Sequence, residues 1–122
     1  MKSRTFNIPL YDYKVTLIEV ESREDVMGVI GILKKNDIPN DAIGEEINFI
    51  NSDKHNGGNV YRNLNKKKFL IILYRMTSAS KRLEVLGHEK RHIEDRLAEH
   101  CGIDDIEAMG YLAGYLTKKL FI

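Results

Sequence analysis

The sequence predicts an α+β fold, in which a small mixed sheet of about three to four strands combines with three helices. Segments 13–20 and 68–76 are rich in β-branched, aliphatic and aromatic residues, which is typical of strands. Three other segments have apolar residues at helical spacing. The predicted order is β-α-β-β-α-α, without repeats or Pro/Gly-rich linkers, so we expect one domain over 1–122.

The first strand, 13–20, leads into a helix. Residues 22–25, Ser-Arg-Glu-Asp, resemble a capping box, and Lys34-Lys35 suit the negative end of the helix dipole. Pro39 stops the helix, and residues 40–56 have a mixed pattern that predicts no particular element. The helical stripe consists of Val26, Val29, Ile30 and Leu33.

A hairpin follows. Residues 55–59, His-Asn-Gly-Gly-Asn, are a turn signal, and 60–62 and 68–76 form two strands joined by 63–66. The second strand is continuously apolar, so we expect it to be buried on both faces. The lysine run 66–68 is typical of a solvated strand flank rather than a phosphate site.

Two helices complete the chain. Residues 77–80, Thr-Ser-Ala-Ser, offer N-cap residues for a long helix over about 79–100, and Gly102 suits its C-terminal cap. Asp104-Asp105 begin a last helix that reaches about residue 120.

Composition and charge exclude some classes of function. The net charge of +1 argues against nucleic-acid binding and against an anionic membrane surface. The single cysteine, Cys101, has no intramolecular partner, which favours a reducing compartment. The N-terminus lacks the apolar core of a signal peptide, and the longest apolar run, 69–74, is too short to span a membrane. We therefore expect a cytoplasmic protein.

The long helix contains His-Glu-x-x-His, from His88 to His92. On a helix, positions i and i+4 share a face about 6 Å apart along the axis, so both imidazoles can bind one zinc ion. Glu89 points to where an attacking water lies and suits a general base. A solvated polar face is the alternative interpretation. It would include Asp95 and Glu99, nearly opposite the apolar stripe of Leu83, Leu86, Ile93 and Leu97.

A catalytic zinc requires a third protein ligand. Glu99 and His100 lie about two turns beyond His92, roughly 10–12 Å along the axis, which is too far. Asp95 is one turn away and suits a hydrogen-bond partner that fixes a histidine tautomer. The third ligand is better sought in the helix that follows the turn at Gly102.

That last helix has two interior glycines, Gly110 and Gly114, each of which costs about 1 kcal/mol relative to alanine. Such a cost favours close helix packing at this face. If the face meets the long helix, Glu107 reaches the metal and Tyr111 can donate its O–H to a developing oxyanion. Alternatively, Asp104-x-x-Glu107 is only a capping box and Tyr111 only packs. The predicted apolar side is Ile106, Met109, Ala113, Leu116 and Leu120.

Residues 85–116 resemble the active-site region of small phage- and mobile-element-encoded zincin-like metallopeptidases of the minimal gluzincin type. Their pattern is an HExxH helix, a short turn, and Glu-Ala-x-Ala-Tyr-Leu-x-Gly-Tyr, which is carried here by 107–115. Residues 7–20 are similar to the opening strand of the family. The resemblance implies a minimal zincin-like domain with one Zn²⁺ per chain, held by His88, His92 and Glu107.

The resemblance also implies that Glu89 is the catalytic acid and base. It implies that strand 68–76 borders the cleft, where an extended peptide adds as a further strand. Four positions depart from known patterns. Gly110 replaces a commoner Ala, and Asp95 excludes the metzincin pattern, which has Gly there. Lys90-Arg91 are unusually charged, so one of them faces the core edge and extends its charge to solvent.

Three functions follow as hypotheses. The first is a zinc-dependent peptidase acting on a peptide or protein substrate. The second is a catalytically inactive zincin-fold binding protein of a mobile element, with a structural metal. The third is a metal-free interaction domain that binds nucleic acid through Arg62 and lysines 66–68, against which the net charge argues.

Overall fold

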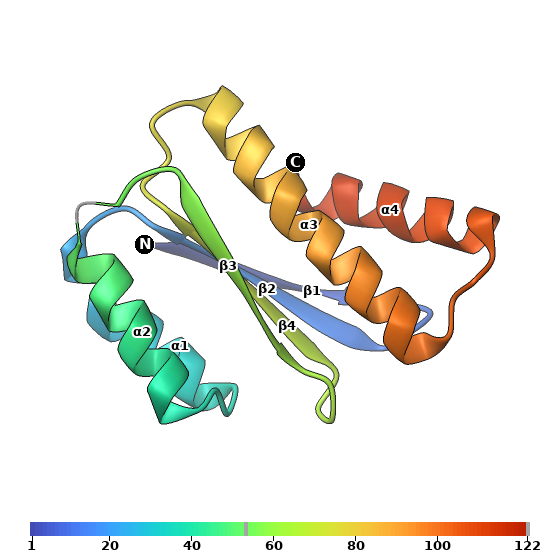
Figure 1. Ribbon diagram of the computed structural model, residues 1–122, viewed down its shortest axis with the longest axis horizontal. Coiled ribbons are helices and arrows are strands. Elements are labelled where there is room, and N and C mark those ends of the chain that lie inside the picture. Colours follow the sequence, from blue (N-terminus) through green and yellow to red (C-terminus); the bar gives the residue numbers. More distant parts are fainter. Residues whose placement is uncertain (53, 122) are drawn as a thin grey trace.

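The computed structural model describes residues 1–52 and 54–121, which form a four-stranded sheet with helices on both faces (Figure 1). The α+β class and the mixed sheet are confirmed. The strands are β1 (Lys2–Ile8), β2 (Tyr13–Val20), β3 (Gly57–Asn63) and β4 (Lys68–Tyr74). The helices are α1 (Val26–Lys35), α2 (Asn40–Asn51), α3 (Ala79–Cys101) and α4 (Ile106–Leu120), and the short 3-10 turn Arg23–Asp25 precedes α1.

The strand order is β1-β2-β4-β3. The neighbours β2 and β4 run parallel, whereas β1 pairs with β2 and β3 pairs with β4 antiparallel. Strand β4 is therefore central, and residues 69–74 are buried, as their apolar run predicts. Strand β3 lies at one edge and has only one pairing partner.

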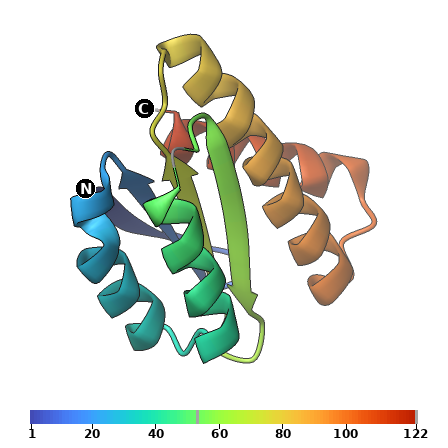
Figure 2. The ribbon, with the colours of Figure 1, turned by 60° about the vertical axis from the view of Figure 1, so that its left-hand side comes forward.

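The sheet separates two apolar cores (Figure 2). Along β4, alternate side chains point to opposite faces, so that Phe69 and Ile71 join the core under α3 and α4 while Leu70 and Ile72 join the core under α1 and α2. This arrangement places α3 over the half of the sheet that ends in β3, because α3 packs against β3 and β4.

Two elements lie outside the predicted set. Strand β1 precedes the predicted first strand, and its polar, mostly exposed residues conceal it because it is an edge strand. Helix α2 occupies a region where no element was predicted. Its buried side contains Ile43 and Ile50, but Glu46 lies between them on the same side and interrupts the apolar stripe.

Two predicted boundaries differ from the structure. The turn signal at 55–59 belongs partly to β3, since the chain turns at Asn56 (φ 55°) and β3 begins at Gly57. Strand β4 ends at Tyr74 because Arg75 has φ 45°, outside the strand region. Its guanidinium donates hydrogen bonds to the carbonyls of Ile50 and Ser52 at the end of α2, which holds this conformation.

The helix caps follow the prediction for α3. The Ser78 hydroxyl accepts a hydrogen bond from the backbone N–H of Lys81, and Gly102 ends the helix with φ 66°. Of the helices that the structure describes, none has both the length and the apolar character needed to cross a bilayer.

Candidate metal centre and groove

The two histidines of the motif face each other on the exposed side of α3. Their Nε2 atoms are 3.1 Å apart, and the rings are nearly perpendicular, with centroids 4.7 Å apart. Two nitrogen ligands at about 2.0–2.1 Å from a tetrahedral zinc ion are about 3.3 Å from each other. The separation of His88 and His92 is therefore compatible with two ligands of one ion, and it is also the distance of a hydrogen bond between the two rings.

The opposite face of α3 is the core face, as predicted. Leu86, Ile93 and Leu97 are fully buried under the helix. Leu83, which was expected in the same stripe, is 55% exposed. The first turns of α3 project beyond the end of the sheet (Figure 1).

Glu89 lies between α3 and β3 and is only 6% exposed. Strand β3 approaches it closely at Gly58. A Cβ atom on Gly58 would lie 2.9 Å from Cγ1 of Val85 and 3.1 Å from Cγ of Glu89. The net effect on the carboxyl is a raised pKa, because burial raises the pKa of Glu89 more than His88 and His92 lower it.

His88, Glu89 and His92 line one pocket of about 340 Å³ between α3 and β3. The rest of its lining comes from β3 and from the next turn of α3, namely Gly58, Asn59, Val60, Arg62 and Arg96. The prediction that strand 68–76 borders the cleft is wrong. Strand β4 is paired on both edges, and the free edge beside the pocket belongs to β3.

The structure does not bring Glu107 to the histidine pair. Over residues 1–52 and 54–121, no three His, Cys, Asp or Glu side chains form a cluster that could hold a metal ion. Glu107 is exposed in the first turn of α4, where its backbone N–H donates to Oδ1 of Asp105. The N-cap is therefore Asp105, and not Asp104 as the capping-box interpretation requires. The assignment of Glu107 as a ligand stays a prediction.

Tyr111 also lies away from the histidines. It is 78% exposed and lines an apolar groove of about 330 Å³ with Pro9, Leu10 and Tyr11 from the turn between β1 and β2. Its predicted role as an oxyanion donor is untested by this arrangement.

Helix α4 buries only part of its predicted apolar side, since Leu116 and Leu120 are buried as predicted and Met109 packs against the core. Leu112, Leu116 and Leu120 are its buried residues, whereas Ile106 is 87% exposed. The expected close packing at Gly110 and Gly114 is wrong, since no atom of another element lies within 4 Å of a Cβ built on either residue.

The charged residues inside and after the motif form ion pairs along α3. Lys90 is the one that faces the core edge, and its Nζ lies 2.5 Å from Oε2 of the buried Glu94. Arg91 is exposed and pairs with Asp95 at 3.3 Å. The carboxylate of Asp95 therefore has a partner other than the histidines.

Five pocket residues were not predicted from the motif, namely Gly58, Asn59, Val60, Arg62 and Arg96. Gly58 belongs to a Gly-Gly pair within a strand, which is a signal of close backbone approach. Arg96 lies four residues after His92 and so shares its helix face. Arg62 was noted only for nucleic-acid binding, and nothing in its local sequence places it beside the histidines.

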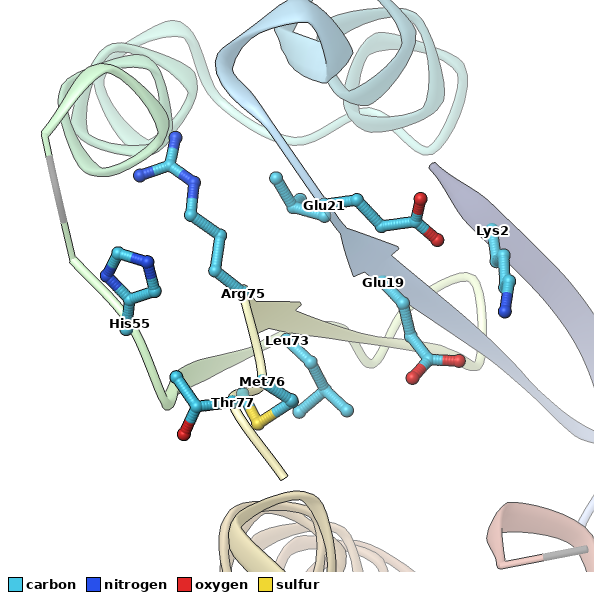
Figure 3. A pocket seen from close by; sticks show the side chains of 9 residues that line it. Lys2, Glu19, Glu21, His55, Leu73, Arg75, Met76 and Thr77 are labelled. Atoms are coloured by element: carbon cyan, nitrogen blue, oxygen red, sulfur yellow. The ribbon is translucent and has the colours of Figure 1, made fainter. Parts of the chain in front are cut away.

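A second, larger pocket of about 390 Å³ lies where β2 and β4 end (Figure 3). Its lining is strongly charged, but charged groups in it already have partners, among them Glu21, which lies 3.9 Å from the N-terminal amine. Arg75 turns toward the end of α2, as Figure 3 shows, and Glu19 accepts a 2.6 Å hydrogen bond from Arg82. The pocket at His88 and His92 is therefore the better candidate for chemistry.

No protein-family model, curated protein or solved structure matches this chain.

Proposed function

We propose that this protein is a zinc-dependent peptidase. One observation carries the proposal: two imidazole Nε2 atoms 3.1 Å apart share a pocket with the buried carboxyl of Glu89, beside the free edge of β3. Each part has a role in peptide hydrolysis, since such a reaction needs a metal site, a general base and a surface that aligns an extended chain.

His88 and His92 would hold the zinc ion, which when bound polarises the scissile carbonyl. Glu89 accepts a proton from the attacking water as the water oxygen bonds to the carbonyl carbon. It then delivers that proton to the leaving amine as the C–N bond breaks, so it acts in turn as base and acid. The exposed edge of β3 aligns the peptide backbone by hydrogen bonding.

The proposal retains Glu107 as the third ligand, as the resemblance to small zincins implies. This requires the first turn of α4 to move toward the histidine pair when the metal binds. Tyr111, one turn further along α4, would move with it and remains the predicted oxyanion donor. A cytoplasmic location also belongs to the proposal, because Cys101 is a free, exposed thiol.

The test is metal content combined with cleavage of a peptide library. We expect about one zinc per chain by elemental analysis, and loss of zinc in His88→Ala and His92→Ala. Glu89→Gln should keep the zinc but lower the cleavage rate by about 10²–10⁴-fold, because the general base is lost. Glu84→Gln, an exposed position of the same helix, is the matched control and should change neither quantity. Protein that takes up no zinc would exclude the proposal.

A catalytically inactive binding protein with a structural metal is the second candidate. The position of Glu107, exposed and apart from the histidines, favours it. In that case a chelator should lower the melting temperature strongly while no peptide is cleaved. A chelator that abolishes cleavage and changes the melting temperature little would favour the peptidase.

A further inference from the structure

We infer that Arg62 and Arg96 form a carboxylate-binding subsite beside the histidine pair, which selects peptides that carry an acidic group near the scissile bond. The inference rests on the proposed peptidase function and adds a substrate class to it. The carboxylate can be an acidic side chain or the C-terminus of a peptide, and the two sources share the same recognition chemistry.

The two arginines lie on facing elements beside the histidine pair. Arg62 and Arg96 line the pocket of His88 and His92, and they also line a neighbouring pocket of about 330 Å³ that ends at His100. Because the two pockets share these two residues, the arginines lie between the pockets. A peptide that extends from Glu89 along the groove between α3 and β3 must pass them.

The elements explain why the two side chains converge. Gly58, Val60 and Arg62 alternate along β3, so all three face α3. Arg96 follows His92 by one helical turn and faces β3. A strand rises about 3.3 Å per residue, and a substrate strand beside β3 rises at the same rate. Arg62 therefore reaches substrate residues within about four positions of the substrate residue that lies opposite Gly58.

Charge makes this part of the groove suited to an anion. Among residues 1–52 and 54–121, the guanidinium of Arg62 has no hydrogen bond or ion pair. Arg96 pairs only with Glu99, at 3.3 Å, and both side chains are well exposed (45% and 74%). Exposed pairs of this kind are weak, so Glu99 does not prevent Arg96 from binding a substrate carboxylate. Guanidinium groups bind carboxylates through two parallel hydrogen bonds, which gives both strength and orientation.

Peptide direction decides which side of the scissile bond carries the acid. A peptide that pairs antiparallel with β3 places its N-terminal residues beside Arg62, and the acid then precedes the scissile bond. A peptide that pairs parallel places its C-terminal residues there, so that an acidic side chain or a terminal carboxylate follows the bond.

The test measures binding separately from cleavage. Short fluorescent peptides with Glu or Gln at each position, and with a free or amidated C-terminus, are titrated into the zinc-loaded Glu89→Gln protein, and Kd is read by anisotropy. We expect Glu at one position, or the free C-terminus, to bind about tenfold tighter than its neutral counterpart. Arg62→Gln and Arg96→Gln should each reduce this preference, and Arg62→Lys should restore it in part.

Lys118→Gln is the matched control, because it removes one positive charge from an exposed position on α4 and should leave the preference unchanged. The inference would be overturned by equal Kd values for Glu and Gln at every position and for both C-termini. In that case, cleavage by the wild-type protein would still support the peptidase. A preserved Glu preference in a protein whose wild type cuts nothing would overturn the peptidase and leave the subsite. The protein could instead bind single-stranded nucleic acid more tightly than any of these peptides and lose that binding in Arg62→Gln. This result would show that the arginines bind phosphates, and it would overturn the inference.

Discussion

At the scale of single residues, the groove depends on a position without a side chain. Gly58 allows β3 to approach α3 so closely that Glu89 is almost fully buried while it still lines the pocket. The neighbouring Val85 is a short, β-branched side chain that cannot easily move aside. The geometry of the proposed general base is therefore set by a residue on another element.

Gly58→Ala tests this dependence. The new Cβ would meet Val85 at 2.9 Å and Glu89 at 3.1 Å, so β3 or Glu89 must shift. We expect a loss of about 1–3 kcal/mol in the free energy of unfolding. We also expect zinc content to be retained and cleavage to fall at least about tenfold, because a displaced base no longer reaches the water.

The matched control is Gly44→Ala in α2, where no atom of the described residues outside the helix backbone lies within 4 Å of the added Cβ. It should raise stability by about 0.5–1 kcal/mol and leave cleavage unchanged. Wild-type cleavage by Gly58→Ala would show that the close approach has no role in the site.

At the scale of elements, the apolar pattern of the sequence predicts the buried side of α3 better than the buried side of α4. Helix α3 has one apolar stripe, and most of it is buried. Helix α4 has apolar residues on more than one side, so two overlapping stripes compete. The structure buries the stripe through Leu112, Leu116 and Leu120 and leaves Ile106, Gly110 and Gly114 exposed.

Gly110→Ala and Gly114→Ala test whether this exposed side of α4 packs against another element. Because neither glycine contacts another element, each alanine should stabilise the protein by about 0.5–1 kcal/mol through its higher helix propensity. Chemical denaturation of the metal-free protein measures the effect. Destabilisation by either substitution would instead indicate the close helix packing that the glycines suggested at first.

The stability of the same two variants in the presence of zinc tests the proposed movement of α4. If the first turn of α4 approaches His88 and His92 on metal binding, the gain in the free energy of unfolding from Gly110→Ala should be smaller, or become a loss, when zinc is present. An unchanged gain in both states would place the glycines away from α3 throughout, and Glu107 would then need a different route to the metal.

At the scale of the whole molecule, β3 connects the candidate site to the opposite face of the sheet. Glu46 on α2 is fully buried there, and its Oε1 accepts hydrogen bonds from Asn59 and from the hydroxyl of Tyr61, both on β3. Its Oε2 has no hydrogen-bond partner among the described residues. Burial is the main reason that the pKa of Glu46 is raised above 4.5, since the two hydrogen bonds act in the other direction.

This raised pKa predicts a pH-dependent stability. The folded state holds the Glu46 proton more tightly than the unfolded chain does, so the contribution of Glu46 to stability is fully present below about pH 4.5 and is lost as pH rises through the folded pKa. We expect Glu46→Gln, which is neutral at every pH, to lack this loss. Its stability relative to wild type should therefore increase between about pH 5 and about pH 8, as measured by urea unfolding.

Glu24→Gln, an exposed position, serves as the control and should shift stability little and evenly with pH. A wild type that becomes more stable relative to Glu46→Gln as pH rises would contradict the assignment, since it would indicate a lowered pKa for Glu46.

Much of this protein is determined by its sequence alone, namely wherever the physics is local. The extent of α3, its caps at Ser78 and Gly102, and the shared face of His88 and His92 all depend on residues within one or two turns. The burial of β4 follows from its apolar run in the same way.

The tertiary structure decided what depends on distant segments. Strand order made β3 the edge beside the histidines, and packing chose which side of α4 is buried. Only the meeting of α3 with β3 brought Gly58 and Arg62 to the motif, because side chains on separate elements become neighbours through the burial of a common core and not through sequence spacing.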